Sequence, residues 1–357
     1  MHKPSRFARM KREGGAVSLS DEWRAWLAEN VAIGVGDAEL CAVLATAGVA
    51  RAIALREIDA VRRSPLTLGA RRLADRVRRY ELAVRLRREV ARTARDPTRI
   101  ERRSNVSADE FFDRYYAGQT PVVITDALAP WPRVRSWSPP SIGDRFGDAE
   151  IAIMAGREGP RGQAEIEGRT TKARVREFCD RVMKADPTND FYLVANNHVL
   201  FTSALRALLE DVAAPHPYLE ERGEARWMSL WIGPAGTVTP MHHDTCNALF
   251  CQIYGRKRVR LVMPFELPMM DAIRSRFYSA RAEANDDVLV QETILEPGEA
   301  LFLPVGTWHE VHALEPSISM SCTGLARANA YPWYTPGDVG RPARAQAVAG
   351  GVRARKA

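Results

Sequence analysis

Cysteine is scarce in this sequence and has no useful spacing. The 357 residues contain five cysteines, an odd number, and none of them forms a CxxC pair. Such a set gives no sign of a disulfide framework. It favours a protein of the reducing cytoplasm.

Long hydrophobic runs are also missing. No stretch approaches the roughly 18 apolar residues that a membrane span requires. The basic segment 1–15 is not followed by the apolar run of a secretory signal. We therefore expect no membrane partner and a cytoplasmic location.

A general excess of basic charge is missing too, although the formal net charge is +7. Residues 70–103 hold thirteen arginines against five acids, and the rest of the chain has 38 basic and 39 acidic residues. A nucleic-acid partner would therefore have to bind through this one Arg-rich helix. A solvated helix face, or a site for an acidic partner, explains the same arginines.

Four regions follow one another along the chain. Residues 1–18 are expected to be flexible, and residues 19–104 to form an α-helical module that begins at the N-cap candidate Ser20. In residues 105–326, short β-rich runs are broken by Gly and Pro, which is typical of a sandwich or barrel. Residues 327–357 are rich in Arg, Ala, Gly and Pro and are expected to form a partly disordered C-terminal arm. The predicted fold class is mainly β with helical additions.

The last helix of the predicted module carries an apolar seam. Leu73, Val77, Tyr80 and Val84 recur at spacings of four, three and four residues. This spacing places them on one helix face, while arginines fill the other faces. The module is a candidate for substrate recognition or for homodimerisation.

The most informative pair of residues lies in the stretch 236–264. His242 and Asp244 stand two residues apart just before a predicted strand, and extended residues at i and i+2 share a face. An imidazole and a carboxylate on one face can coordinate the same metal ion, and a third ligand would complete a facial triad. His309 is the candidate, because Gly/Pro turns on either side of the apolar strand 300–303 bring it near a barrel mouth.

Lys257 is predicted to point into the fold. It shares strand parity with Val259 and Leu261, whereas Arg258 and Arg260 have the opposite parity. An ammonium in an apolar interior is costly unless it meets an anion, so the pattern predicts a carboxylate-bearing ligand inside the barrel. A lysine that snorkels out at the strand end is the alternative.

The same parity argument excludes two other histidines from the predicted triad. His243 should point away from His242, and His312 should point away from His309. Histidines at such positions are more often hydrogen-bonded wall residues than metal ligands.

Five motifs between Val106 and Leu325 carry a family resemblance: PVVITDALAPWP, FYLVANN, TPMHHD, QIYGRKR and LFLPVGTWHEVHAL. In this order and spacing they resemble the JmjC and cupin-like 2-oxoglutarate oxygenases, among them hydroxylases of the type that inhibits hypoxia-inducible factor. The resemblance implies a double-stranded β-helix, or jelly-roll (cupin) barrel, behind the helical module. It also implies Fe(II), the cosubstrate 2-oxoglutarate and O2.

Carried over residue by residue, the resemblance implies that His242, Asp244 and His309 are the catalytic iron ligands. It implies that Lys257 pairs with the distal carboxylate of 2-oxoglutarate, and that Thr239 and Tyr192 donate hydrogen bonds to the same carboxylate. The commonest pattern has an Asn four residues after the Asp ligand. Here Ala248 occupies that position, and Asn247, one residue earlier, is expected to contact the cosubstrate or to support the site from outside.

The predicted reaction is hydroxylation of a side chain in a peptide or protein, with release of succinate and CO2. Demethylation would follow if the hydroxylated carbon were attached to nitrogen. A hydroxylase for tRNA or another nucleic acid is the first alternative, because of the Arg-rich helix 70–103. A cupin that binds metal without a ketoacid is the second, and the inward lysine argues against it.

Overall fold

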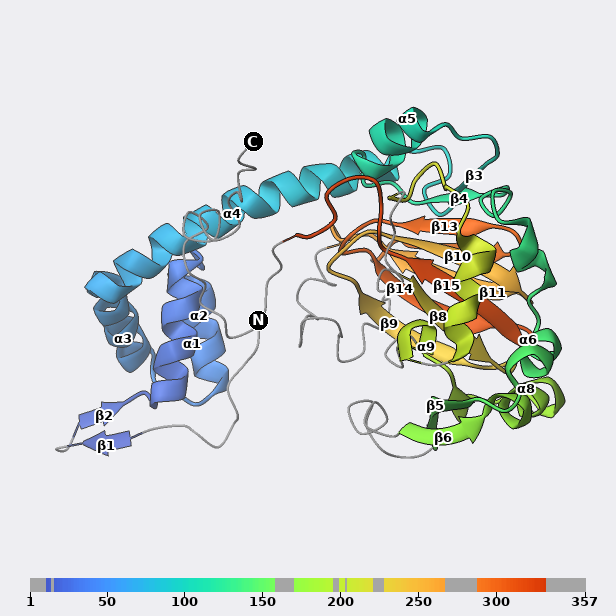
Figure 1. Cartoon of the computed structure of the whole chain (residues 1–357). Helices are drawn as coiled ribbons and strands as arrows, with labels where there is room; N and C mark the ends of the chain where they lie inside the picture. Colours follow the sequence, from blue (N-terminus) through green and yellow to red (C-terminus); the bar gives the residue numbers. More distant parts are fainter. Residues whose placement is uncertain are drawn as a thin grey trace, which may run out of the picture. The chain divides into compact units, whose positions relative to one another are not determined.

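The computed structural model describes residues 11–13, 16–157, 170–194, 199–202, 204–220, 228–266 and 288–331 (Figure 1). The chain divides into two compact units, residues 1–90 and 91–357. Most of the expected flexible N-terminus and of the expected C-terminal arm lies outside the described residues. Within the former, strands β1 (Lys11–Glu13) and β2 (Ala16–Ser18) pair as an antiparallel hairpin.

The first unit is helical, as its sequence predicts. Its helices are α1 (Asp21–Ala32), α2 (Asp37–Thr46), α3 (Arg51–Arg63) and α4 (Pro65–Arg92), the last of which crosses the division between the units. The Ser20 hydroxyl accepts a hydrogen bond from the backbone N of Trp23 at 3.4 Å, which confirms the predicted N-cap. The core is made by apolar side chains of α1–α3, among them Trp26 and Leu44. None of the described helices combines the length and the apolar content that crossing a membrane would take.

Two antiparallel sheets form most of the second unit. The larger sheet has the order β3-β4-β13-β10-β15-β8, with only β3 and β4 parallel, and the smaller one has the order β12-β11-β14-β9. The larger sheet comprises β3 (Glu101–Arg103), β4 (Val122–Ile124), β8 (Met228–Gly233), β10 (Ala248–Tyr254), β13 (Ala300–Leu303) and β15 (Ser317–Cys322). The smaller sheet comprises β9 (Val238–His243), β11 (Lys257–Val262), β12 (Val290–Leu295) and β14 (Trp308–Ala313).

Alternation along the strands decides which side chains lie between the two sheets. Phe250 of the larger sheet belongs to one buried cluster with Val259 and Val311 of the smaller sheet, so this cluster is the interior of the jelly roll. The next residues along β10, Leu249 and Cys251, belong to a different cluster on the outer face of the larger sheet. The predicted mainly β fold with preceding helices is confirmed, in the form of two packed sheets.

Helical segments and a third, small sheet surround this double sheet. The small sheet has the order β6-β5-β7, and helices α6 and α8 pack on each other beside it (Figure 1). These elements are β5 (Glu150–Ala155), β6 (Thr170–Arg174), β7 (Phe191–Tyr192), α6 (Pro139–Phe146) and α8 (Val175–Lys184). The short helical segments are α5 (Ala108–Glu110), η1 (Phe111–Tyr116), η2 (Pro132–Ser136), α9 (Val199–Thr202) and η4 (Ala204–Val212). Strand β7 carries Tyr192, one of the residues that the sequence predicts to contact the cosubstrate.

Candidate metal centre

Neighbouring strands of the smaller sheet bring the three predicted ligands together. His309 of β14 lies directly opposite His242 of β9, and their ring centroids are 4.1 Å apart. Asp244 follows the last residue of β9, and its backbone oxygen accepts a hydrogen bond from the Gly306 backbone N at 3.0 Å. This bond ties the end of β9 to the turn that leads into β14.

The donor atoms of these three residues fit a divalent metal ion. One ligand atom from each lies within 4.8 Å of the others, and the Asp244 Oδ2 to His309 Nε2 distance is 3.8 Å. Each histidine Nδ1 lies near a backbone oxygen, that of Pro240 at 2.7 Å for His242 and that of Thr307 at 2.9 Å for His309. An Nδ1–H that donates to these oxygens leaves both Nε2 atoms as lone-pair donors.

Burial keeps one of these imidazoles neutral. The pKa of His309 is lowered to about 4, first by desolvation and then by the neighbouring His242. A neutral imidazole is the form that coordinates a metal. Two imidazoles and one carboxylate on one side of an ion form the facial set that suits non-haem Fe(II) and leaves positions open for other ligands.

A β-bulge brings Thr239 to the same side as His242. Between the pairs His309–His242 and Val311–Thr239, strand β9 has one residue more than β14, and Pro240 lies in this irregular stretch. Thr239 and His242 therefore both face the interior, although they are three residues apart and a regular strand would separate them. Simple alternation does not reveal this arrangement.

Lys257 is fully buried, with 1% of its surface exposed, and it points inward as predicted. Its Nζ donates a hydrogen bond to the Tyr192 hydroxyl at 3.1 Å. The same ammonium lies 5.5 Å from the ring centroid of Phe250. Among the residues that the structure describes, no carboxylate pairs with this ammonium. A bound anion would compensate the desolvation of its charge.

The two other histidines do not join this set. His243 lies beside Trp308, with ring centroids 4.6 Å apart, in a cluster on the outer side of the smaller sheet. The Nε2 of His312 lies 2.9 Å from the Glu310 carboxylate. Both side chains point away from the centre, as the parity argument predicts.

Asn247 is completely buried and connects three segments. Its Oδ1 accepts hydrogen bonds from the Val305 backbone N at 2.8 Å and from the Gln119 side chain at 3.3 Å. Its Nδ2 donates to Asn329 Oδ1 at 3.0 Å and to the Tyr331 hydroxyl at 3.3 Å. Because these groups already have protein partners, the geometry favours support of the turn before β14 over direct contact with a cosubstrate.

We expect Asn247→Ala to weaken both the fold and the centre. Removal of the amide leaves the Val305 N–H without its partner, while Asn329 loses the bond from Asn247 Nδ2 but keeps its bonds to the Asn247 backbone. We expect the free energy of unfolding to fall by about 2–3 kcal/mol. Cobalt(II) affinity should fall about tenfold, because the turn before β14 loses its anchor. Urea unfolding and a cobalt absorption titration measure the two effects.

Gln119→Ala is the matched control for this change. It removes the hydrogen bonds that the Gln119 side chain donates to Asn247 Oδ1 and to the Tyr116 backbone oxygen, and it leaves the Val305 contact in place. We expect a loss of less than about 1 kcal/mol and an unchanged cobalt affinity. Equal effects of the two substitutions would contradict the anchoring role of Asn247.

Some neighbours of the centre were not predicted from the sequence. Arg157 donates to the Val238 backbone oxygen at 2.9 Å, and its guanidinium lies 5.3 Å from the Tyr192 ring centroid. Asn329 and Tyr331, which hold Asn247, belong to the segment that the sequence assigns to the C-terminal arm. No motif marks these positions, since their role depends on contacts between distant segments.

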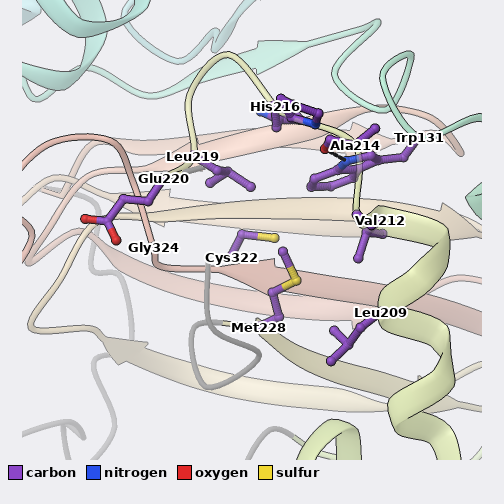
Figure 2. A pocket seen from close by; sticks show the side chains of 12 residues that line it. Trp131, Leu209, Val212, Ala214, His216, Leu219, Glu220, Met228, Cys322 and Gly324 are labelled. Carbon is purple, nitrogen blue, oxygen red and sulfur yellow. Dashed lines mark hydrogen bonds between the residues drawn. The ribbon is translucent and has the colours of Figure 1, made fainter. Parts of the chain in front are cut away.

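A cavity of about 280 Å³ lies elsewhere, on the outer face of the larger sheet. Figure 2 shows Trp131, Leu209, Met228 and Cys322 around it, with His216 at one end. His216 contacts the Ala127 backbone oxygen at 2.9 Å, and burial lowers its pKa to about 4. None of the predicted metal or cosubstrate residues lines this cavity.

Comparison with known proteins gives a family match over most of the second unit. Residues 108–322 match the cupin-like domain. The chain is 30% identical over 238 residues to lysine-specific demethylase JMJ30 of Arabidopsis thaliana, covering 62% of this chain and 54% of the relative. It is 28% identical over 235 residues to Jumonji C domain-containing protein 5 of Drosophila melanogaster, covering 60% and 57%.

A third relative is lysine-specific demethylase 8 of Xenopus tropicalis. It is 30% identical over 229 residues, which cover 60% of this chain and 50% of the relative. The chain thus spans about half the length of the curated relatives it matches.

Proposed function

We propose that this chain, which belongs to the cupin-like domain family and has a Jumonji C domain-containing relative, is an Fe(II)- and 2-oxoglutarate-dependent oxygenase. His242, Asp244 and His309 would hold the iron. Lys257 would bind the distal carboxylate of 2-oxoglutarate, with Tyr192 and Thr239 as hydroxyl donors. Asn247 would hold the turn before β14 in place.

When bound, the iron and 2-oxoglutarate supply the oxidation of a substrate C–H bond by O2, in which one oxygen atom enters the substrate and the other enters succinate, with release of CO2. The residues of the chain supply orientation. The backbone oxygens of Pro240 and Thr307 fix the two imidazole rings, and Tyr192 fixes the Lys257 ammonium. Apolar side chains of the interior, among them Phe250, exclude water from this ammonium.

The buried Lys257–Tyr192 pair is the observation that carries the proposal. A cupin that binds metal without a ketoacid has no use for a buried ammonium within the same double sheet. A carboxylate ligand compensates the desolvation of this charge, which is otherwise unfavourable. The pair thus favours a dicarboxylate cosubstrate over the other cupin chemistries.

The test is an anaerobic absorption titration of the purified chain with Fe(II) and 2-oxoglutarate. We expect a visible charge-transfer band that needs both components and does not appear when succinate replaces 2-oxoglutarate. Succinate has no 2-oxo group and so cannot chelate the metal in the same way. Iron binding without a ketoacid-dependent band would contradict the oxygenase proposal and favour a cupin of another type.

The proposed substrate is a side chain of a peptide or protein. Two of the relatives are named lysine-specific demethylases, which supports a protein substrate, and hydroxylation is the reaction we propose here. The two outcomes differ in product mass, because hydroxylation adds one oxygen, about 16 Da, whereas demethylation removes about 14 Da and releases formaldehyde. Mass spectrometry of peptides incubated with the enzyme separates them.

A nucleic-acid substrate is the second candidate. The observation that favours it is the excess of arginine in residues 70–103, because phosphate contacts made by arginine supply sequence-independent affinity. Homodimerisation through the helical unit and a cytoplasmic location also stay predictions.

A further inference from the structure

Helix α4 carries a regular apolar seam that the proposed catalytic function does not use. The residues of this α4 seam follow one another at spacings of four, three, four, three and four: Leu66, Ala70, Leu73, Val77, Tyr80 and Val84. This alternation is the heptad repeat with which one helix packs along another. A surface helix that packs against no other helix along this face does not require such a repeat.

The α4 seam is largely exposed. Leu66, Leu73, Val77 and Tyr80 are between 52% and 85% exposed, and Thr67 is the only buried side chain of α4. The helix is attached to α1 through a different face. There, Arg71 donates to the Val31 backbone oxygen at 3.4 Å, and Arg78 donates to the Ile33 backbone oxygen. Large apolar side chains in such a continuous row mark an interaction surface.

The charge of α4 selects the kind of partner. Residues 65–92 contain nine arginines and three acids. Asp75 and Glu81 lie near arginines of the same helix, 3.9 Å from Arg79 and 4.0 Å from Arg85. Counted over its own residues, the helix has a net charge of +6, and Arg92 at its end also pairs with Glu266 at 3.4 Å. A second copy of α4 would place one strongly positive helix against another, which is unfavourable.

Other occupants fit less well. The terminal stretch 332–357 is itself basic, with five basic residues against one acid, so it does not complement α4. A flat membrane surface requires one apolar face. In α4, a second apolar group, Leu68, Leu82 and Leu86, lies on nearly the opposite side of the helix at about 100° per residue. Nucleic acid uses the arginines but not the apolar seam.

We propose that the α4 seam docks an acidic amphipathic helix of a partner protein. Leucine-like side chains of the partner would pack along Leu66, Leu73, Val77 and Tyr80. Its carboxylates would be attracted by the net positive charge of α4, whose arginines lie mainly on the other faces of the helix, with Arg76 next to the seam. The interaction uses neither the metal centre nor the cosubstrate, so it holds or fails independently of the proposed oxygenase reaction.

The test uses the full chain and a synthetic probe. The probe is a fluorescein-labelled peptide of four heptads with Leu at positions a and d and Glu at positions e and g. A control peptide has the same composition with its leucines moved out of the heptad register. We expect the fluorescence anisotropy of the first peptide to saturate at a concentration of chain at least about tenfold lower than that of the control.

Two pairs of substitutions locate the binding surface. Leu73→Ser with Val77→Ser should weaken binding of the heptad peptide at least about tenfold. Leu82→Ser with Leu86→Ser, on the opposite side of the same helix, should change it less than about twofold. Circular dichroism and thermal unfolding establish that both variants keep α4 folded, and turnover of 2-oxoglutarate should be the same in both.

Three results would overturn the proposal. Equal binding of the two peptides would mean simple attraction between charges. Sedimentation of the chain as a dimer that dissociates on Leu73→Ser with Val77→Ser would assign the seam to a second copy. A salt-dependent shift of tRNA that Arg78→Glu with Arg79→Glu abolishes, without binding of the heptad peptide, would assign α4 to nucleic acid.

Discussion

His242→Ala should abolish the absorption band that Fe(II) and 2-oxoglutarate form with this chain. It should lower the turnover of 2-oxoglutarate on the order of 10³-fold. Mutation of a residue that hydrogen-bonds to a metal ligand lowers metal affinity or activity by about 10- to 100-fold. Loss of one of the three ligands themselves should lower both by more. Because a ligand stabilises only the folded state, Fe(II) or cobalt(II) should raise the melting temperature of the parent but not that of the variant.

His312→Ala is the matched control. This histidine lies on the same sheet three residues after His309 and contacts Glu310 on the outer side. We expect its band, its turnover and its metal-dependent melting temperature to stay close to those of the parent. If the absorption band persisted in His242→Ala, His242 would not be a metal ligand, even if turnover fell.

The orientation of the residues on β11, on β14 and at the end of β9 was predictable from local rules. Lys257 alternates with Arg258 and Arg260 on a strand, so parity alone is enough to place its side chain inside. His243 and His312 point outward for the same reason. Helix α1 begins where its capping residue predicts, because the bond between Ser20 and Trp23 is local in sequence.

Contacts that depend on irregular or distant geometry were not predictable in this way. The bulge beside Pro240 changes the parity of β9, so the orientation of Thr239 relative to His242 follows from pairing with β14 and not from the sequence of β9. The partners of Asn247 include residues 58 and 82 positions further along the chain and one 128 positions earlier. The seam of α4 was predicted as a helix face, but periodicity alone does not say whether a partner within the chain covers it.

The buried ammonium of Lys257 has opposite effects on stability and on cosubstrate binding. Without an anion it is desolvated, and among the described residues the Tyr192 hydroxyl accepts a hydrogen bond from it. Replacing a buried charge by an apolar side chain of similar length is often neutral or stabilising. With a dicarboxylate bound, the same charge becomes one half of a water-excluded ion pair, and removal of one partner of such a pair costs several kcal/mol.

Lys257→Met should therefore stabilise the empty chain and destroy its affinity for 2-oxoglutarate. We expect the free energy of unfolding without ligand to be unchanged or up to about 1 kcal/mol higher. The 2-oxoglutarate concentration for half-saturation of the absorption band should rise at least about 100-fold. Urea unfolding without ligand and the anaerobic titration measure the two quantities on the same preparation.

Arg260→Met separates this effect from a general loss of positive charge. Arg260 lies on the same strand but on its outer face, where it contacts Glu310 at 3.3 Å. We expect its titration to match that of the parent. If Lys257→Met lowered the free energy of unfolding and left the titration unchanged, the lysine would be a structural residue. A loss of affinity in an equally stable chain means instead that the fold keeps an unfavourable charge in its interior because the cosubstrate requires it.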